Sequence, residues 1–268
     1  MTGRRAIIGL SLLSTLVFCA FAAPSATAVL GTTAFKCVKT DAIGEEFSDE
    51  HCTNQEQGKA GFTQMQITPN TEAKITVNNS VTGSEVFNSK LRGVAAGIEF
   101  TLEASSFHSC VNKTTVENKK PGERGEAVGK FCGEFSTVKV NKPAKCEIEK
   151  GIIKLLESGT GKTIVKEVEK KQEMYIEFIP PEGKPFAEFT FAGGECALKG
   201  TKVSVTGSAK ANVTTNESQT DGATLNFTTA QTGKTLKAAG NEAAFEGVFT
   251  PREVSAEAPP VVLTTANF

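Results

Sequence analysis

Alternation between apolar and polar side chains over residues 203–213 limits most strongly what this chain can fold into. The apolar residues of the segment fall on one parity: Val203, Val205, Ala209, Ala211 and Val213. Serine, threonine, lysine and asparagine hold the other parity. A period of two places successive side chains on opposite faces of an extended strand, whereas a helix has a period of about 3.6. The segment therefore predicts a strand with one apolar face and one solvated face.

Similar alternation recurs in shorter segments along the chain. These segments are Thr33–Cys37, Thr63–Thr68, Ala73–Val77, Ile98–Leu102, Ser136–Val140, Met174–Phe178 and Phe186–Phe191. The run Pro180–Gly183 breaks any helix and predicts a turn between the last two. Residues 151–171 carry a partial helical pattern, but the apolar stripe does not continue, so we expect two strands joined by a turn at Ser158–Gly161. We predict an all-β chain that folds as an antiparallel β-sandwich.

A candidate domain boundary lies at Asn141–Pro143, directly after a predicted strand. The expected parts are an N-terminal β domain over residues 29–142, a C-terminal β domain over residues 143–252 and a loose tail over residues 253–268. No segment between the two domains has the composition of a long flexible linker. The two β lobes are therefore expected to abut.

The first residues have the pattern of an export signal. A basic start precedes an apolar run over residues 6–22, and the small residues Ala26 and Ala28 follow. This order is typical of a secretory signal peptide, here residues 1–28. A retained anchor is the weaker alternative, because the run is at the short limit for a membrane span and no charged stop-transfer segment follows it. We predict a secreted, extracellular protein with no membrane span after signal cleavage.

Charge argues against a nucleic-acid partner. The 268-residue chain carries 29 Lys and Arg against 30 Asp and Glu, for a formal net charge of −1. Removal of residues 1–28, with two arginines and no acid, changes this charge only to about −3. Surfaces that bind phosphates need a basic excess, so neither nucleic acid nor an anionic membrane surface is an expected partner.

Cysteine usage agrees with the predicted location. Of seven cysteines, Cys19 lies in the signal segment, and the others are Cys37, Cys52, Cys110, Cys132, Cys146 and Cys196. An even number in an exported chain favours disulfides over metal or redox chemistry. Six cysteines allow fifteen pairings; we expect the nearest-neighbour set, Cys37–Cys52, Cys110–Cys132 and Cys146–Cys196. Each closed loop is then worth roughly 3–4 kcal/mol on the chain-entropy model.

Metal ligation is not expected. The chain has two histidines, His51 and His108, and each lies close to a cysteine that we assign to a disulfide. Zinc sites usually need two close pairs of ligands, and no Cys-x-x-Cys pair is present. We therefore predict no metal site and no cofactor.

The sequence contains no clear catalytic motif. The G-x-S-x-G elbow of serine hydrolases is absent, and a histidine beside a disulfide is a poor general base. Paired carboxylates remain the alternative, with Glu177 and Glu188 on facing strand segments. Alternation already places both on the solvated face, where a charge needs no catalytic role. We predict a protein that is not an enzyme, with a secreted hydrolase using these two carboxylates as the alternative.

Carbohydrate recognition by stacking is disfavoured. Sugar-binding surfaces rely on tryptophan or tyrosine platforms, and this chain has no tryptophan and one tyrosine, Tyr175. The phenylalanines mostly hold positions expected for core residues. Contact with a cell-wall or extracellular protein surface through strand edges and polar faces remains open.

Several short segments carry a resemblance to a known group of proteins. Besides the signal pattern, they are Phe35–Val38 with His51–Cys52, Ala187–Phe191 leading to Cys196, Val205–Ser208 and Phe245–Thr250. They resemble secreted, β-rich proteins of soil actinobacteria over most of the mature chain. This resemblance implies a location and a fold type, and it assigns no catalytic residue. The resulting prediction is a disulfide-stapled, non-catalytic protein of the cell envelope or extracellular space, with a surface-contact or structural role.

Overall fold

The computed structural model of the chain describes residues 33–40, 47–48, 61–67, 73–79, 81–82, 85–86, 88–110, 113–118, 127–155, 159–168, 171–214, 224–253 and 261–264. Within these residues the fold is almost all antiparallel β, as predicted. Their helical elements are α1 (Thr229–Thr232) and the 3₁₀ turn η1 (Glu149–Gly151). The predicted signal peptide, residues 1–28, lies outside the described residues.

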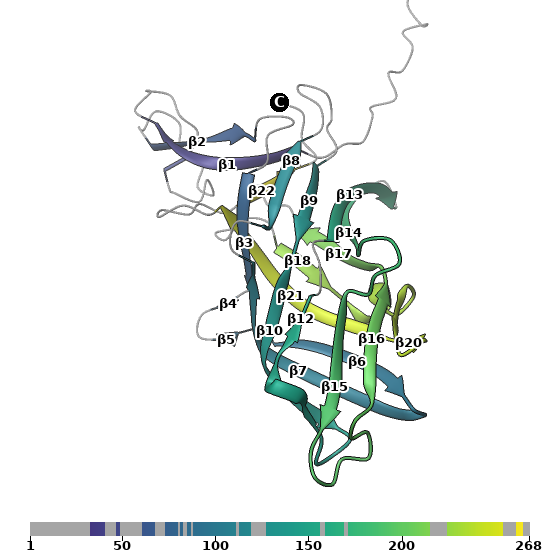
Figure 1. Cartoon of the computed structure of the whole chain (residues 1–268). Coiled ribbons are helices and arrows are strands. Elements are labelled where there is room, and N and C mark those ends of the chain that lie inside the picture. Colours follow the sequence, from purple (N-terminus) through teal and green to yellow (C-terminus); the bar gives the residue numbers. More distant parts are fainter. Residues whose placement is uncertain are drawn as a thin grey trace, which may run out of the picture. The chain divides into compact units, whose positions relative to one another are not determined.

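Ten of the described strands form one closed ring of antiparallel neighbours, all of which are labelled in Figure 1. In ring order they are β7 (Ile98–Ser109), β3 (Ala73–Asn79), β8 (Thr115–Asn118), β9 (Ala127–Phe131), β13 (Gly159–Val168), β14 (Lys171–Ile179), β17 (Ala209–Thr214), β18 (Thr224–Phe227), β21 (Ala244–Glu253) and β6 (Ser89–Ala95). The pairing of β6 with β7 closes the ring. β21 pairs with β6 through its first residues and with β3 through its last ones, so β6 and β3 lie end to end along β21. β10 (Gly133–Lys142) and β12 (Ile153–Lys154) extend this sheet beyond β7.

This barrel corrects the predicted β-sandwich. A sandwich consists of two sheets that each keep open edges, whereas here the β6–β7 pairing joins one end of a sheet, β6, back to β7 and so closes a ring. Side-chain alternation is the same in both arrangements, because each requires one apolar face per strand. The barrel also draws on strands from both sides of residue 142, where we expected a boundary between the lobes 29–142 and 143–252: β9 pairs directly with β13.

A five-stranded sheet packs against part of the barrel. Its strands, in order, are β11 (Glu147–Ile148), β15 (Ala187–Ala192), β16 (Lys202–Gly207), β19 (Leu236–Ala238) and β20 (Asn241–Glu242). Phe189 and Phe191 of β15 meet Phe100 of β7 edge to face, with ring centroids 5.9 and 5.5 Å apart. All three side chains are buried in one apolar cluster that joins the sheet to the barrel.

The segment 203–213 passes from this sheet into the barrel. β16 pairs with β15 in the five-stranded sheet, and β17 pairs with β14 in the barrel. The chain crosses from one sheet to the other at Gly207, which has a φ of 100°. A Cβ there would lie 2.0 Å from the carbonyl oxygen of Thr235, so only glycine fits. The apolar face predicted for the segment is confirmed, because all five of its alternating apolar residues are buried.

The predicted turn at Ser158–Gly161 is wrong. Gly159 and Gly161 lie within β13, which forms the hairpin with β14 instead. Both glycines face large aromatic side chains of neighbouring strands, and this packing replaces the turn as the reason for their presence.

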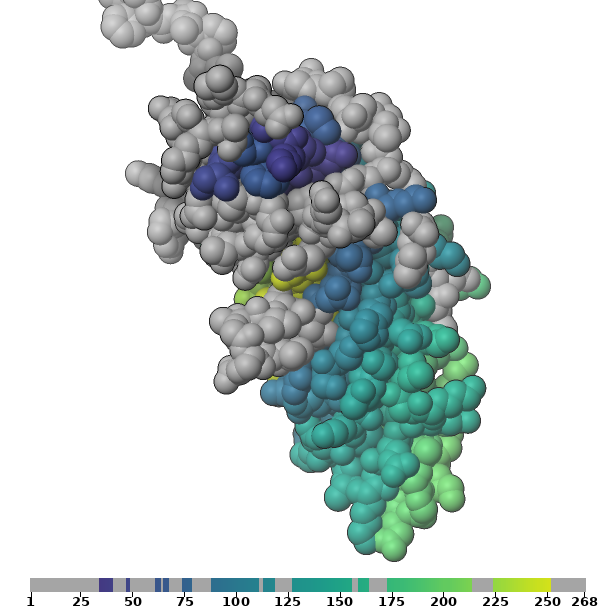
Figure 2. All heavy atoms as spheres, turned by 90° about the vertical axis from the view of Figure 1, so that its left-hand side faces the viewer, coloured from purple at the N-terminus to yellow at the C-terminus, as the bar shows by residue number. Residues whose placement is uncertain are grey.

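A three-stranded sheet is tied to the barrel by one buried asparagine. The sheet consists of β2 (Gly61–Gln66), β1 (Thr33–Thr40) and β22 (Val261–Thr264), and a separate pair consists of β4 (Val81–Thr82) and β5 (Glu85–Val86). The Asn118 amide donates to the carbonyl oxygens of Ala34 (3.0 Å) and Ile67 (2.7 Å), and its oxygen accepts from the Ala34 N–H (2.9 Å). β22 belongs to residues 253–268, which we expected to form a loose tail. In Figure 2, β1 and β2 (purple and blue) gather at one end of the visible face, and teal residues cover its middle.

Two predicted disulfides are confirmed, Cys110–Cys132 and Cys146–Cys196. Cys37 is also disulfide-bonded, but its predicted partner Cys52 lies outside the described residues. Disulfides are typical of an oxidising, extracellular-type environment. Among the helices of the described ranges, none is long and apolar enough to cross a membrane.

Candidate functional site

An apolar cavity of about 160 Å³ lies inside the barrel. Barrel strands supply most of its wall, and the five-stranded sheet adds Ala187, Val205 and Leu236. None of the described residues that line it carries a charge. A β-barrel can hold a ligand where its inward side chains leave the interior unfilled. This cavity is therefore the candidate binding site.

Aromatic rings form the part of the wall contributed by β7, β10, β18 and β21. Phe107, Phe135, Phe227, Phe245 and Phe249 make one connected cluster, in which neighbouring ring centroids lie 4.7 to 6.5 Å apart. Most of these pairs meet edge to face, the geometry that the ring quadrupole favours. The inner surface is thus complementary to hydrocarbon rather than to a polar molecule.

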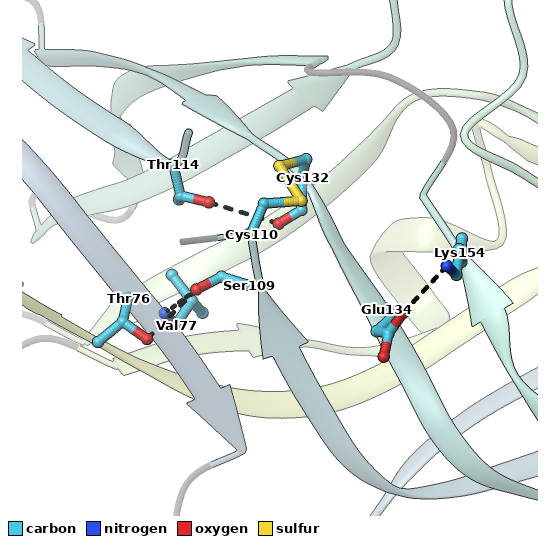
Figure 3. Close-up of a disulfide and its surroundings, with 8 residues drawn as sticks. All are labelled: Thr76, Val77, Ser109, Cys110, Thr114, Cys132, Glu134 and Lys154. Atoms are coloured by element: carbon cyan, nitrogen blue, oxygen red, sulfur yellow. Dashed lines mark hydrogen bonds and ion pairs between the residues drawn. A yellow bond between two sulfur atoms is a disulfide. The ribbon is translucent and has the colours of Figure 1, made fainter. Parts of the chain in front are cut away.

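Two hydroxyl groups in the wall are already engaged by the protein (Figure 3). Ser109 Oγ accepts a hydrogen bond from the Val77 N–H (2.8 Å) and donates one to Thr76 Oγ1 (3.3 Å). Thr114 Oγ1 donates to the carbonyl oxygen of Cys132 (3.4 Å), beside the disulfide. A polar ligand group would have to compete with these bonds, since burial without a partner is costly. The wall therefore favours an uncharged, apolar ligand.

A second cavity, of about 70 Å³, adjoins the first. Both cavities are lined by Val77, Thr114, Phe131, Phe178 and Leu225. The smaller one extends toward β8, β9 and β13, where Ile75 and Val116 contribute apolar surface and Thr163 a hydroxyl group. The interior thus has a wide part and a narrow part that meet at a shared wall.

The size of the wide part sets the scale of a ligand. An engineered cavity of about 150 Å³ lined by Leu, Ile and Phe stays dry and binds benzene. The wide cavity is of similar volume and wall chemistry. Removal of each ligand CH₂ group from water contributes about 0.8 kcal/mol. The site can therefore bind and shield a compact hydrocarbon group, and no acid, base or free thiol lines it among the described residues.

The carboxylates Glu177 and Glu188 are not brought together as a pair. Glu177 lies on β14, which pairs with β13 and β17, and Glu188 lies on β15, which pairs with β11 and β16. The expectation that they lie on facing strands is wrong, because the turn after β14 leads into the other sheet. Each has its own partners: Ser208 donates to Glu177 (2.9 Å), whereas Ser204 (2.8 Å) and Lys202 (2.8 Å) hold Glu188.

Lys202 should control the ionisation of Glu188. Hydrogen bonds from Lys202 and Ser204 lower the pKa of the Glu188 carboxyl below its ordinary value of 4.5. We expect Lys202→Met to raise this pKa toward that value, measured by the carboxyl ¹³C shift against pH, with the exposed Lys199→Met as control. Since the folded-state pKa is lowered, the contact stabilises the fold above the unfolded-state pKa, and this contribution is lost as pH falls through the folded-state pKa. An unchanged pKa in Lys202→Met would contradict the assignment.

His108 lies on the outer side of β7 rather than beside a reactive group in the cavity. Its Nε2 is 2.7 Å from Ser106 Oγ, and both side chains lie apart from the cavity walls. The residue opposite on β10 is Glu134, whose carboxylate pairs with Lys154 at 3.7 Å. A serine nucleophile needs its histidine base oriented by a third group. The geometry at His108 supports a surface hydrogen bond, and His51 lies outside the described residues.

Sequence reasoning missed the cavity although it placed the phenylalanines in the core. The available signal was the combination of large aromatic residues with small ones on the inner faces of strands. Ala104, Ala187 and Ala209 all line the cavity, and their short side chains leave the space that the rings do not fill. Such a pattern can be read only when the strands that face one another are known.

Fold and site together define an antiparallel, disulfide-stapled β-barrel with an apolar cavity of ligand size. No protein-family model, no curated protein and no solved structure matches the chain. The resemblance to secreted proteins of soil actinobacteria stays a prediction.

Proposed function

We propose that this protein is a non-catalytic binding protein that holds a small, uncharged, apolar molecule inside its barrel. The single observation that carries this proposal is the cavity of about 160 Å³ with no charge in its described wall. Buried ligand sites are mostly apolar with few polar groups, and this wall follows that rule. Transport or storage of a poorly water-soluble compound is the role that such a site suits best.

Secretion is part of the same proposal. The export pattern of residues 1–28 and the disulfides support it. Outside the cell, a poorly soluble molecule needs a carrier to cross water, because exposed apolar surface is unfavourable there.

Contact with a cell-wall or extracellular protein surface is a separate prediction. The outward-facing side chains of the strands form ion pairs such as Arg92–Glu246 (3.2 Å) and Lys142–Glu99 (2.7 Å). Exposed pairs of this kind keep a surface hydrated and contribute little energy. They are compatible with a partner without specifying its chemistry.

Toluene tests the cavity directly. We expect saturable binding with a dissociation constant on the order of 0.1–1 mM, observed as NMR shifts of the cavity-lining methyl groups of Leu91, Leu225 and Leu236. Ala104→Leu fills the cavity and should weaken binding by roughly tenfold or more, which is the loss of about 1.4 kcal/mol. Ala197→Leu, on an exposed turn, is the control and should leave it unchanged. Shifts that are linear in toluene, or spread over the outer surface, would refute the proposal.

A further inference from the structure

The wide and narrow cavities meet at a pair of aromatic rings. Among the residues that line both, Phe131 of β9 and Phe178 of β14 are the largest. Their ring centroids lie 4.9 Å apart and their planes cross at 88°. This edge-to-face contact places two rings where a chain-like ligand would have to pass from one cavity into the other.

Two glycines of the intervening strand fix these rings in place. β13 lies between β9 and β14, and its register sets Gly159 opposite Phe131 and Gly161 opposite Phe178. A Cβ at Gly159 would lie 2.5 Å from Phe131 Cε1, and one at Gly161 would lie 3.2 Å from Phe178 Cε1. The missing side chains thus create the space that the rings occupy. The chain has a matched glycine for each member of the aromatic pair.

The two cavities differ in what they can accept. The wide one, about 160 Å³, suits a ring-sized group, whereas the narrow one, about 70 Å³, suits only part of an alkyl chain. A ligand with a compact ring and a linear tail would use both cavities if the passage were open. With the rings in contact, the narrow cavity stays out of reach of a ligand in the wide one.

We propose that Phe131 and Phe178 form a partition that limits ligand length, so that the protein selects compact hydrocarbons over long-chain ones. This inference depends on the proposed function, because it concerns the specificity of the same site. It assigns the two residues to specificity rather than to general core packing. Other phenylalanines of the wall, such as Phe245, line the wide cavity alone and should affect ligand width instead.

A series of n-alkylbenzenes from toluene to octylbenzene separates these roles. In the unmodified protein, affinity should rise over the first members and then fall as the chain reaches the partition. In Phe178→Leu and in Phe131→Leu, the optimum should move to longer chains, with a gain of about fourfold for each additional CH₂ that enters the narrow cavity. Phe245→Leu is the matched control; it should improve binding of wider rings and leave the optimum chain length unchanged.

The outcomes distinguish failure of the proposed partition from failure of the proposed binding function. If toluene binds all variants saturably but both leucine variants keep the optimum of the unmodified protein, the partition is refuted and the binding function stands. If no alkylbenzene binds the folded, unmodified protein, the binding function is refuted and the partition with it. A shift in Phe245→Leu as large as in Phe178→Leu also refutes the partition, because wall volume alone would then set length. Two leucine variants on different strands keep the test valid if one does not fold.

Discussion

Replacement of Cys146 and Cys196 together by alanine is expected to lower the free energy of unfolding by about 4 kcal/mol. This disulfide closes a loop with a sequence separation of 50, so it removes considerable entropy from the unfolded chain. Both cysteines are also buried in the cluster that joins the five-stranded sheet to the barrel. Urea unfolding without reductant, followed by far-UV circular dichroism, measures the loss.

The other described disulfide provides the matched comparison. Cys110–Cys132 has a sequence separation of only 22, so its removal by two alanines should cost less, about 3 kcal/mol. A larger loss for this pair than for Cys146–Cys196 would show that loop length does not govern the stability of this protein.

Phe100→Ala should destabilise the protein by about 3–5 kcal/mol, the range for a fully buried phenylalanine. Its side chain is only 1% exposed and contacts both Phe189 and Phe191. Because this cluster joins two sheets, the space left behind cannot collapse by movement of one strand. Thermal and urea unfolding both report the change, and Phe62→Ala, at a half-buried position, should cost clearly less.

A double-mutant cycle identifies the origin of that effect. Gly93 lies opposite Phe100 on β6, and a Cβ at Gly93 would lie 2.8 Å from Phe100 Cζ. Gly93→Ala alone should cost about 1–3 kcal/mol by overpacking. In the Phe100→Ala background most of this cost should disappear, giving a coupling of about 1 kcal/mol or more. Strict additivity would contradict direct packing of the ring on the glycine.

Strand positions could be predicted from the sequence because alternation depends only on local geometry. The segment Ile98–Leu102 falls within β7, and its expected inner residues Phe100 and Leu102 are buried. The strand itself continues to Ser109, beyond Leu102 where the predicted segment ended, and its buried positions change parity between Ala104 and Phe107. A pattern of period two cannot continue across such a change.

The arrangement of the strands could not be predicted in the same way. Val205 and Ala209 share a parity and are both buried, yet they belong to different sheets because Gly207 redirects the chain. The ring also needs pairing between residues far apart in sequence, such as Leu91 of β6 and Phe245 of β21. Neither feature has a signature in local periodicity.

The candidate site also depends on the arrangement of the strands and not on local sequence patterns. The sequence directed attention to Glu177, Glu188 and the histidines, because charged and titratable residues are conspicuous in a chain without a known motif. The cavity is instead lined by apolar residues that, in the sequence, look like any other core residues. Only their arrangement in the fold leaves a space between them. An apolar binding site is therefore the kind of site that sequence patterns reveal least.

The position of β21 has a consequence for biosynthesis. This strand, Ala244–Glu253, pairs with β18 on one edge and with β3 and β6 on the other, so it links the C-terminal strands of the barrel to the N-terminal ones. During N-to-C-terminal synthesis, β6 can pair early with β7 and β3 with β8, but the edges of β3 and β6 that pair with β21 stay open until almost the entire chain has emerged. Such long-range pairing makes folding slow, and a chain released before residue 244 would have no enclosed interior to offer a ligand.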